Sequence, residues 1–399
     1  MILVAYITLQ ASSVFTYKGT AEINYARDVY GQGMGGTGIG DLLRINTSLQ
    51  NPALSTTLDK TYFATGLSMG YTTYSDIDKN TFKDDQIFLP YLYISFPYKN
   101  NRFGINFSNI SSGSLDTEKE GFTNFNDPEE DPIKYRLEQN VSFSLYQAGI
   151  FHAYKSKIMN VGIALNYIIG HRIEYTASEF PREHNLVNSM FELDQSFSNP
   201  TFVFGIAKEF ETLSAGASYT LPVELKGEST FKSNLTTDPN GDAYYDYPAS
   251  LAFGMAWKPI TSLSFSTDFD YQQWKDTDNF PNPVNTTRIG AGLAWTGASR
   301  SNLFFTKIPA RFGMSYRNLP FTINDSKINE IAYHFGLSIP LKQSENSIDF
   351  ALKLFERGDA NKHDYEESGF LLSIGTQGFD FLRKPQNRKE PRDIPKPSR

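Results

Sequence analysis

The dominant pattern in this 399-residue chain is an alternation of apolar and polar side chains with a period of two residues. Between Leu263 and Tyr271 the odd positions are Leu, Phe, Thr, Phe and Tyr, and the even positions are Ser, Ser, Asp and Asp. The stretches 159–169 and 333–339 alternate in the same way. Side chains two residues apart lie on the same face of a β-strand. Each stretch therefore predicts a strand with one apolar and one polar face.

Such stretches recur along most of the chain, and about fourteen can be counted, an even number as single-chain bacterial membrane barrels require. Each is roughly 10–13 residues long, which is enough to cross a bilayer as a tilted strand. Short connections alternate with long polar stretches, which we interpret as turns at one end and external loops at the other. The predicted strands are 62–74, 87–99, 102–112, 141–155, 159–173, 200–210, 213–226, 248–258, 262–274, 286–297, 308–318, 329–341, 346–357 and 367–378. The predicted external loops are 113–140, 174–199, 227–247, 275–285 and 358–366.

The predicted fold class is all-β, a transmembrane antiparallel β-barrel of about 14 strands. Aromatic residues such as Tyr98, Trp257 and Trp274 lie near segment ends, where the membrane interface would be. A soluble all-β protein is the alternative, because alternation does not say which face turns outward. Strand length and the alternation of short and long connections favour the barrel, since soluble strands average about 5–6 residues.

Composition excludes several classes of function. The chain has no Cys, which removes disulfide scaffolds, thiol catalysis and Cys-based metal sites. Its net charge is −7, and basic residues concentrate only between Arg383 and Arg399, so the body shows no electrostatic footprint for nucleic acid. No apolar run reaches the about 20 residues that a membrane-spanning helix needs, which excludes a helical membrane protein. No linker interrupts 62–381, which predicts one large closed unit.

The two ends differ in composition from this central unit. Residues 1–13 consist of an apolar stretch followed by the small residues Ala11, Ser12 and Ser13. This pattern is typical of the end of a secretory signal peptide, but the basic N-terminal region of such a signal is missing. An ordinary apolar strand is the open alternative. The predicted organisation is a signal-peptide remnant at 1–13, an N-terminal plug at 14–60, the barrel at 61–382 and a basic, Pro-rich periplasmic tail at 383–399.

A glycine-rich stretch from Gly31 to Gly40 precedes the first predicted strand. It contains the spacing G-x-G-x-x-G, but no βαβ unit follows, so dinucleotide binding is not supported. Dense glycine lets backbone pack in a confined space, as in a plug inside a barrel lumen. Together with Asn51-Pro52-Ala53, the stretch resembles the N-terminal hatch of the FadL/TodX family of outer-membrane transport proteins. The hatch residues that this resemblance implies are Gly33, Gly35, Gly36, Gly38, Asn51, Pro52 and Ala53.

Two further segments strengthen the resemblance. The segment from Tyr247 to Pro259 has Pro-Ala-Ser directly after Tyr247 and leads to an aromatic Tyr-x-x-Trp ending at Trp274, which is similar to a hairpin of the family. The segment from Leu221 to Gly227 resembles the family's strand just upstream of that hairpin. The family implies a monomeric fourteen-stranded barrel closed by a hatch, with hydrophobic ligands captured outside and released laterally or inward after the hatch moves. The part from Ile308 to Phe321 looks more like relatives such as PorV, a component of the type IX secretion system that handles protein substrates.

The predicted function is transport of a hydrophobic small molecule, such as a long-chain fatty acid, across the bacterial outer membrane, with membrane lipid around a monomeric barrel. The alternative is a PorV-like component with a periplasmic or secretion partner, or a structural barrel without uptake. Uptake predicts an apolar pocket above the hatch, whereas the alternative predicts a wide lumen with little apolar pocket. The candidate ligand-binding residues are Phe122, Phe125, His171, Arg172, Phe180, Leu186 and Phe191.

No motif predicts catalysis, a metal or a cofactor. His152 with Ser142 or Ser144 is the one arrangement that suggests a lipase, and nothing else supports it. The stretch 238–246 has carboxylates in the spacing of a calcium loop but lacks the Gly and Glu that such a loop requires. We therefore predict a solvated loop there and a protein that is not an enzyme.

Overall fold

The computed structural model describes residues 13–15, 22–25, 27–47, 49–123, 133–181, 186–236, 240–297, 308–341 and 346–378. The helical elements are α1 (Val29–Gln32), η2 (Pro52–Thr57), η4 (Trp274–Asp276) and α2 (Ala360–His363). The strands are β1 (Glu22–Ile23), β2 (Tyr62–Asp76), β3 (Thr81–Phe88), β4 (Tyr91–Tyr98), β5 (Asn101–Thr123), β6 (Ile133–Tyr154), β7 (Asn160–Glu179), β8 (Ser189–Phe210), β9 (Leu213–Thr220), β10 (Val223–Ser233), β11 (Gly241–Tyr247), β12 (Ser250–Ile260), β13 (Leu263–Gln272), β14 (Thr286–Trp295), β15 (Ala310–Ile323), β16 (Ser326–Pro340), β17 (Ser347–Gly358) and β18 (Tyr365–Gln377). Within these ranges no helix is both long and apolar enough to cross a membrane.

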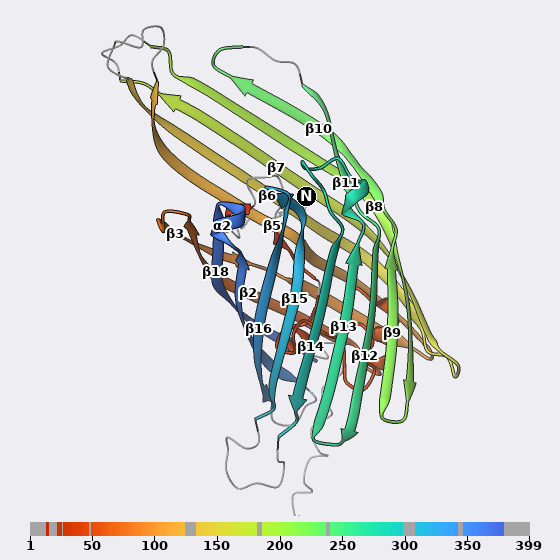
Figure 1. Ribbon diagram of the computed structural model, residues 1–399. Helices are drawn as coiled ribbons and strands as arrows, with labels where there is room; N and C mark the ends of the chain where they lie inside the picture. Colours follow the sequence, from red (N-terminus) through yellow and green to blue (C-terminus); the bar gives the residue numbers. More distant parts are fainter. Residues whose placement is uncertain are drawn as a thin grey trace, which may run out of the picture.

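The strands form one antiparallel sheet that closes into a cylinder, because β18 pairs with β2 along its whole length (Figure 1). Of the eighteen strands in the described residues, β1 belongs to the N-terminal segment, residues 22–58. Three pairs, β3 with β4, β9 with β10 and β11 with β12, are halves of single bent wall strands separated by two residues each. Fourteen wall strands remain, which confirms the predicted fold class and strand number.

The outward face of the wall is apolar and the inward face is polar. Along β7, Val161 and Leu165 are 40 % and 38 % exposed, while Asn166 is fully buried. The outward side chains of β8 and β16 are likewise exposed Phe, Ile, Tyr and Leu residues. A soluble barrel would bury its apolar face, whereas a membrane barrel turns it toward lipid. The structure therefore decides the question that the alternation left open, in favour of a membrane barrel.

A charge in the middle of this apolar band should be destabilising. Leu165 lies halfway between Val161 and Ile169 on the outward face of β7. We expect Leu165→Arg to lower the free energy of unfolding from lipid vesicles by about 2–4 kcal/mol, measured by urea titration. Ile173→Arg is the matched control on the same strand and face, but beyond the band, and should cost less than about 1 kcal/mol. Equal losses would contradict this placement of the membrane.

All fourteen predicted strands are confirmed, but three predicted loops are wrong over most of their length. The stretches 113–140, 174–199 and 227–247 consist largely of continuations of β5 to β8 and of the hairpin β10–β11. Their outward side chains are mostly polar, and apolar side chains such as Leu137 and Leu193 face the lumen, so the alternation continues with its apolar face turned inward. Backbone pairing with neighbouring strands nevertheless continues, because ladder hydrogen bonds do not depend on side-chain polarity.

These continuations form a tall wall that leans beyond the rest of the barrel (Figure 1). Its outward face carries exposed ion pairs, among them Arg136 with Glu118 at 2.8 Å and Lys232 with Glu192 at 2.6 Å. Its other face continues the lumen-facing register and presents Leu137, Leu193 and Phe231, among other residues. The tall wall comprises 113–123, 133–142, 171–181, 186–198, 223–233 and 241–247.

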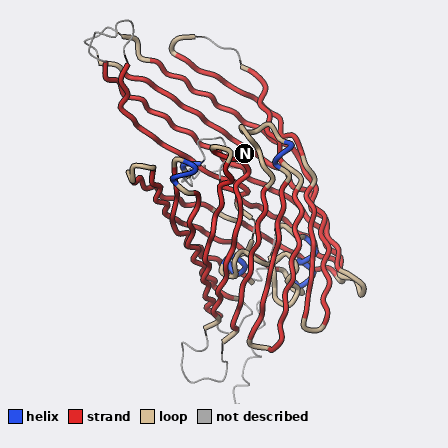
Figure 2. Tube along the Cα trace, viewed as in Figure 1, coloured by secondary structure: helices blue, strands red, loops and turns tan. Residues whose placement is uncertain are grey.

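The two largest hydrophobic clusters of buried side chains lie in the described lumen. The outer cluster lies at the base of the tall wall and is aromatic, with the ring of Tyr245 5.1 Å from that of Phe143 and 5.3 Å from that of Phe197. The second cluster contains Tyr62 and Tyr93, near the end with short turns. Two of the short helices drawn in Figure 2 belong to the N-terminal segment, and they contact the wall, α1 at β16 to β18 and η2 at β6 to β8. The lumen is therefore occupied by the protein's own side chains.

The wall is incomplete where β3 and β4 meet. β4 pairs with β5 from Tyr98 to Tyr91, but β3 pairs only with β2 among the described strands. The change occurs at Leu89–Pro90, since proline has no N–H to donate to a ladder. Beyond it, β5 pairs with β1, where Glu22 lies opposite Ser112. We call this place the wall break.

Candidate functional site: the N-terminal segment and the lumen cavity

Local sequence signals shape the N-terminal segment. The Asp28 carboxylate accepts a hydrogen bond from Gly31 N at 2.7 Å, which caps α1. The Asn51 side chain caps η2 in the same way through Ala53 N, and Pro52 occupies the first turn, where no N–H is needed. The polar residues Asp28 and Asn51 therefore fix where the two short helices begin.

Glycine allows the segment to lie directly against the wall. Gly35 has a φ of +73°, and a Cβ there would meet the backbone of Ala291 and Met314. Gly40 lies against the backbone of Gly254 and Gly216 in the same manner. These contacts are with the neighbouring strands β9, β12, β14 and β15, whereas Gly66 of β2 lies against Val29, so the segment touches the lumen-facing wall on more than one side.

The residues expected to form the hatch are all buried in this segment. Gly33 lies against Gly336, Gly36 against the Arg288 guanidinium, and Gly38 N donates to Asp268 at 2.8 Å. Asn51 Nδ2 donates to Ile39 O at 2.8 Å and to Ile206 O at 3.1 Å. Pro52 and Ala53 lie against Gly162. Their role as a hatch remains a prediction.

A buried charge cluster joins the middle of the segment to the wall. Arg27 Nη2 lies 3.0 Å from Asp270 and 3.1 Å from Asp268, and Arg288 Nη1 lies 2.9 Å from Asp270. All four side chains are nearly inaccessible. A buried charge is tolerated only with a close partner, so the two aspartates of β13 depend on Arg27.

A second cluster lies within the segment itself. Arg44 forms ion pairs with Asp28 at 2.7 Å and with Asp41 at 3.0 Å. Burial raises the pKa of Asp28, but the neighbouring Arg44 outweighs burial and holds that pKa below its usual value. The Tyr30 ring lies between the guanidinium groups of Arg44 and Arg311, 4.4 and 4.1 Å from its centroid. This contact ties the segment to β15.

A third charge cluster, between β1 and the wall strands β15 to β17, contains one acid of the N-terminal segment. The Glu22 carboxylate lies 2.8 Å from Arg317, 3.0 Å from Arg357 and 3.4 Å from Lys353. Glu330 contacts the same three cations at 2.5 to 2.9 Å. Burial raises the pKa of Glu22, but the three cations lower it to about 2.

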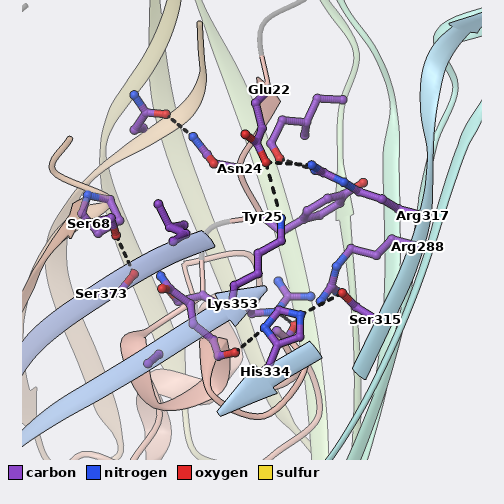
Figure 3. A pocket seen from close by; sticks show the side chains of 18 of the residues that line it. Glu22, Asn24, Tyr25, Ser68, Arg288, Ser315, Arg317, His334, Lys353 and Ser373 are labelled. Atoms are coloured by element: carbon purple, nitrogen blue, oxygen red, sulfur yellow. Dashed lines mark hydrogen bonds and ion pairs between the residues drawn. The ribbon is translucent and has the colours of Figure 1, made fainter. Parts of the chain in front are cut away.

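A cavity of about 90 Å³ lies beside the wall break, between the segment and the wall. Figure 3 shows Glu22, Tyr25 and Lys353 converging on it, with His334 and Ser315 below. Its charged and polar lining includes Glu22, Arg27, Arg288, Arg317, Glu330 and Lys353. Its apolar lining is Ile23, Phe88, Pro90, Ala351 and Leu371. The cavity thus has a charged side formed by the N-terminal segment together with β14 to β17, and an apolar side that includes Phe88 and Pro90 at the wall break.

The residues expected to bind ligand do not surround this cavity. Arg172 and Phe191 lie on the lumen-facing side of the tall wall, whereas His171 and Phe122 follow its outward register. The His171 ring lies 2.8 Å from Asp194. Phe180 and Leu186 are partly buried near the tip of the wall, and Phe125 lies outside the described residues. Their role in binding remains a prediction.

Sequence reasoning missed the charge cluster beside the cavity. Arg317, Lys353 and Arg357 each occupy the polar face of an alternating strand, so the signal was present as unexpected charge at lumen-facing positions. What the pattern did not show is that different strands bring these charges together. Within the described ranges, no group of His, Cys, Asp or Glu has the arrangement of a metal site.

Comparison with known proteins identifies the family of this chain. A sequence model of the BamG family matches residues 1–377. The chain belongs to the BamG family. No curated protein matches this BamG-family chain at a significant level.

Solved structures resemble the BamG-family chain in fold. The toluene transporter TbuX of Ralstonia pickettii is 15 % identical with a TM-score of 0.61, over 89 % of this chain and 98 % of that one. The toluene transporter TodX of Pseudomonas putida is 16 % identical with a TM-score of 0.61, over 90 % and 98 %. The CymD monoaromatic hydrocarbon channel is 14 % identical with a TM-score of 0.59, over 89 % and 98 %. These matches support the FadL-like architecture, while the relation to PorV remains a prediction.

Proposed function

We propose that this BamG-family chain is a monomeric channel of the bacterial outer membrane that moves a hydrophobic small molecule and releases it sideways through the wall break. The observation that carries this proposal is the wall break itself. There Pro90 ends the pairing of the wall, and Ile23 and Asn24 occupy the vacated edge of β5 beside the lumen cavity.

The N-terminal segment acts as a plug in this proposal. A fourteen-stranded barrel encloses more space than its own inward side chains fill. The segment from Glu22 to Leu58 occupies that space and is held by buried ion pairs and by close backbone contacts. Direct flow through the lumen is therefore blocked, and movement of residues 22–25 is the smallest change that connects the cavity to the membrane.

A route toward the cavity leads along the tall wall. Its lumen-facing side carries Leu137, Leu193 and Phe231 above the barrel mouth, and the aromatic cluster around Tyr245 follows below. Apolar solutes gain free energy at such surfaces, by roughly 25 cal/mol for each Å² removed from water. The wall thus provides a capture surface in place of the closed apolar pocket that the sequence predicted.

Similarity of fold to channels that carry toluene and monoaromatic hydrocarbons supports the proposal. The apolar outer band of the barrel supports a membrane location, and its strand number is that of a bacterial outer-membrane barrel. Long-chain fatty acids are one ligand class that this route would accept.

Cross-linking the strap, residues 22–25, to β5 tests the lateral route. Ile23 and Ser111 are opposite each other in the pairing of β1 with β5, and the chain has no other Cys. We expect oxidised Ile23→Cys/Ser111→Cys protein to lose uptake of a fluorescent hydrophobic probe into liposomes, down to the level of protein-free vesicles. Reduction of the disulfide should restore uptake, because it frees the strap.

The control pair is Leu92→Cys/Phe107→Cys, which joins β4 to the same strand below the wall break. Its oxidation should leave uptake unchanged, since β4 and β5 are already paired there. Unaltered uptake by the oxidised strap variant would rule out lateral release.

The tall wall favours a second candidate function, a PorV-like or structural barrel that holds a protein partner. The observation behind it is that the tall wall is open and amphipathic, with ion pairs on one face and Leu and Phe side chains on the other. Folded wild-type protein that moves no hydrophobic probe in liposomes would favour this second function over transport.

A further inference from the structure

Two lumen-facing side chains that the transport proposal does not use, Ser315 of β15 and His334 of β16, are in contact on the wall of the cavity. Ser315 Oγ lies 2.9 Å from His334 Nε2, and both residues are only 5 % exposed. Gly313 is directly opposite His334 in the pairing of the two strands, so Ser315 is the diagonal neighbour of His334 on the same face. The pairing of β15 with β16 therefore holds a hydroxyl group and an imidazole within hydrogen-bond distance.

The N-terminal segment determines which nitrogen of the His334 ring carries the proton. His334 Nδ1 lies 2.8 Å from the carbonyl oxygen of Gln32, the last residue of α1. Because a carbonyl oxygen only accepts, Nδ1 donates, and a neutral ring then has Nε2 as its acceptor. The Ser315 hydroxyl donates to Nε2 in turn. This is the orientation in which an imidazole removes the proton of a serine nucleophile.

Two cations lie near this Ser–His pair. Lys353 is directly opposite His334 in the pairing of β16 with β17, and Arg288 comes from β14, the strand next to Ser315. Each is held by a buried carboxylate of the wall at 2.9 Å. Figure 3 shows Ser315, Arg288 and Lys353 around the His334 ring. Positive charge at such a place stabilises a serine alkoxide and the oxyanion that forms when the alkoxide attacks a carbonyl group.

We propose that Ser315 and His334 form a serine-esterase site, which hydrolyses small apolar carboxylic esters. The inference goes beyond the transport function proposed above and rests on it only for the entry of the ester past the strap. The volume of about 90 Å³ limits the site to small molecules, and the apolar lining at Phe88, Pro90 and Leu371 suits a short acyl chain. Recognition then depends on a carbonyl carbon within reach of Ser315 Oγ and not on a charged head group.

The reaction has two steps, with water as the second reactant. In the first step, Ser315 Oγ bonds to the carbonyl carbon of the ester while its proton passes to His334 Nε2. The bond from that carbon to the alcohol oxygen then breaks, and the alcohol leaves with the proton. In the second step, water attacks the acyl carbon and gives a proton to Nε2, which returns it to Oγ as the acyl–Oγ bond breaks. The products are the carboxylic acid and the alcohol.

The Ser–His pair that the sequence suggested is a different one, and the structure does not form it. His152 Nε2 lies 2.9 Å from Asn101 Oδ1, at the end of β6 with short turns. Ser142 and Ser144 lie further along β6, toward the tall wall, where Ser144 is opposite His171 and follows the outward register. Ser144 therefore provides a serine on the same barrel that has no place at the cavity.

Methanesulfonyl fluoride, a small reagent for activated serines, tests the proposal on the unaltered protein. Ser315 Oγ bonds to its sulfur, fluoride leaves, and the hydroxyl proton passes to His334. We expect full-length wild-type protein in an uncharged detergent to gain a single methanesulfonyl group, located at Ser315 by peptide mass spectrometry. This measurement depends on the folding of no variant. The absence of an adduct at Ser315 would overturn the proposal.

Two variants test whether the pair carries out hydrolysis. We expect Ser315→Ala and His334→Gln to hydrolyse vinyl acetate at least about a hundredfold more slowly than wild type, measured as release of acid, because the nucleophile or its base is gone. Ser144→Ala is the matched control, which should keep both the adduct at Ser315 and the wild-type rate. Equal rates in Ser315→Ala and Ser144→Ala would mean that Ser315 is not the nucleophile.

A transport measurement separates this proposal from the channel function. Uptake of a neutral hydrophobic probe into liposomes should be the same for Ser315→Ala and wild type, because the hydroxyl group takes no part in passage. Failure of the channel function appears as wild-type protein that moves no probe. Failure of the esterase appears as a missing adduct and an unchanged rate in Ser315→Ala.

Discussion

Gly313→Leu should open the barrel. A side chain at Gly313 would meet the backbone of Met34 and Gly35, which cannot give way as a flexible side chain could. The N-terminal segment must then move off β15, and we expect the permeation of small sugars into liposomes to rise on the order of tenfold, since the lumen of a fourteen-stranded barrel is no longer filled. The measurement is the swelling rate of proteoliposomes.

Gly241→Leu is the control for this substitution. Gly241 lies in β11 of the tall wall, and a Cβ there would meet no atom within 4 Å. The two variants add the same side chain to the same fold, so only the contact with the segment differs. A swelling rate that is equal in both would show that residues 33–40 do not close the lumen.

Arg27→Met should also weaken the attachment of the N-terminal segment to the wall. It removes the buried ion pairs of Arg27 with Asp268 and Asp270, whereas Gly313→Leu adds a side chain that clashes. Arg27→Met leaves Asp268 and Asp270 buried with Arg288 as their remaining cation. Breaking a buried pair costs about 3–5 kcal/mol. In a Met34→Cys background the new thiol replaces a side chain that is 2 % exposed. The rate at which a water-soluble thiol reagent labels this Cys should rise by roughly two to four orders of magnitude when Arg27→Met is added.

Two further variants show whether charge is the cause. Arg136→Met removes an arginine whose ion pair with Glu118 is exposed, and such pairs contribute about 0–1 kcal/mol, so labelling should change less than about tenfold. Adding Asp268→Asn to Arg27→Met should recover part of the protection, because one unpaired carboxylate is removed. If Arg27→Met labels no faster than Arg136→Met, the buried cluster does not hold the segment.

The candidate site was only partly predictable from the sequence. Gly35 and Asn51 could be singled out from the sequence, because glycine spacing and an Asn-Pro pair are local signals, and their role as hatch residues stays a prediction. The charge cluster around Glu22 was not found, since Arg317, Lys353 and Arg357 come from two strands and meet this acid almost three hundred residues away from Arg317 in the chain. Long-range pairing of this kind leaves no trace in a single sequence.

The sequence by itself determined that the chain forms about fourteen amphipathic strands joined as an antiparallel meander, because a period of two residues fixes which side chains share a face. Only the tertiary structure decided that the apolar face turns outward, that polar stretches such as 227–247 extend the wall, and that Pro90 leaves it open beside β1. The physical reason is that alternation constrains one strand at a time. Closure, strand extension and charge balance depend on which strands become neighbours.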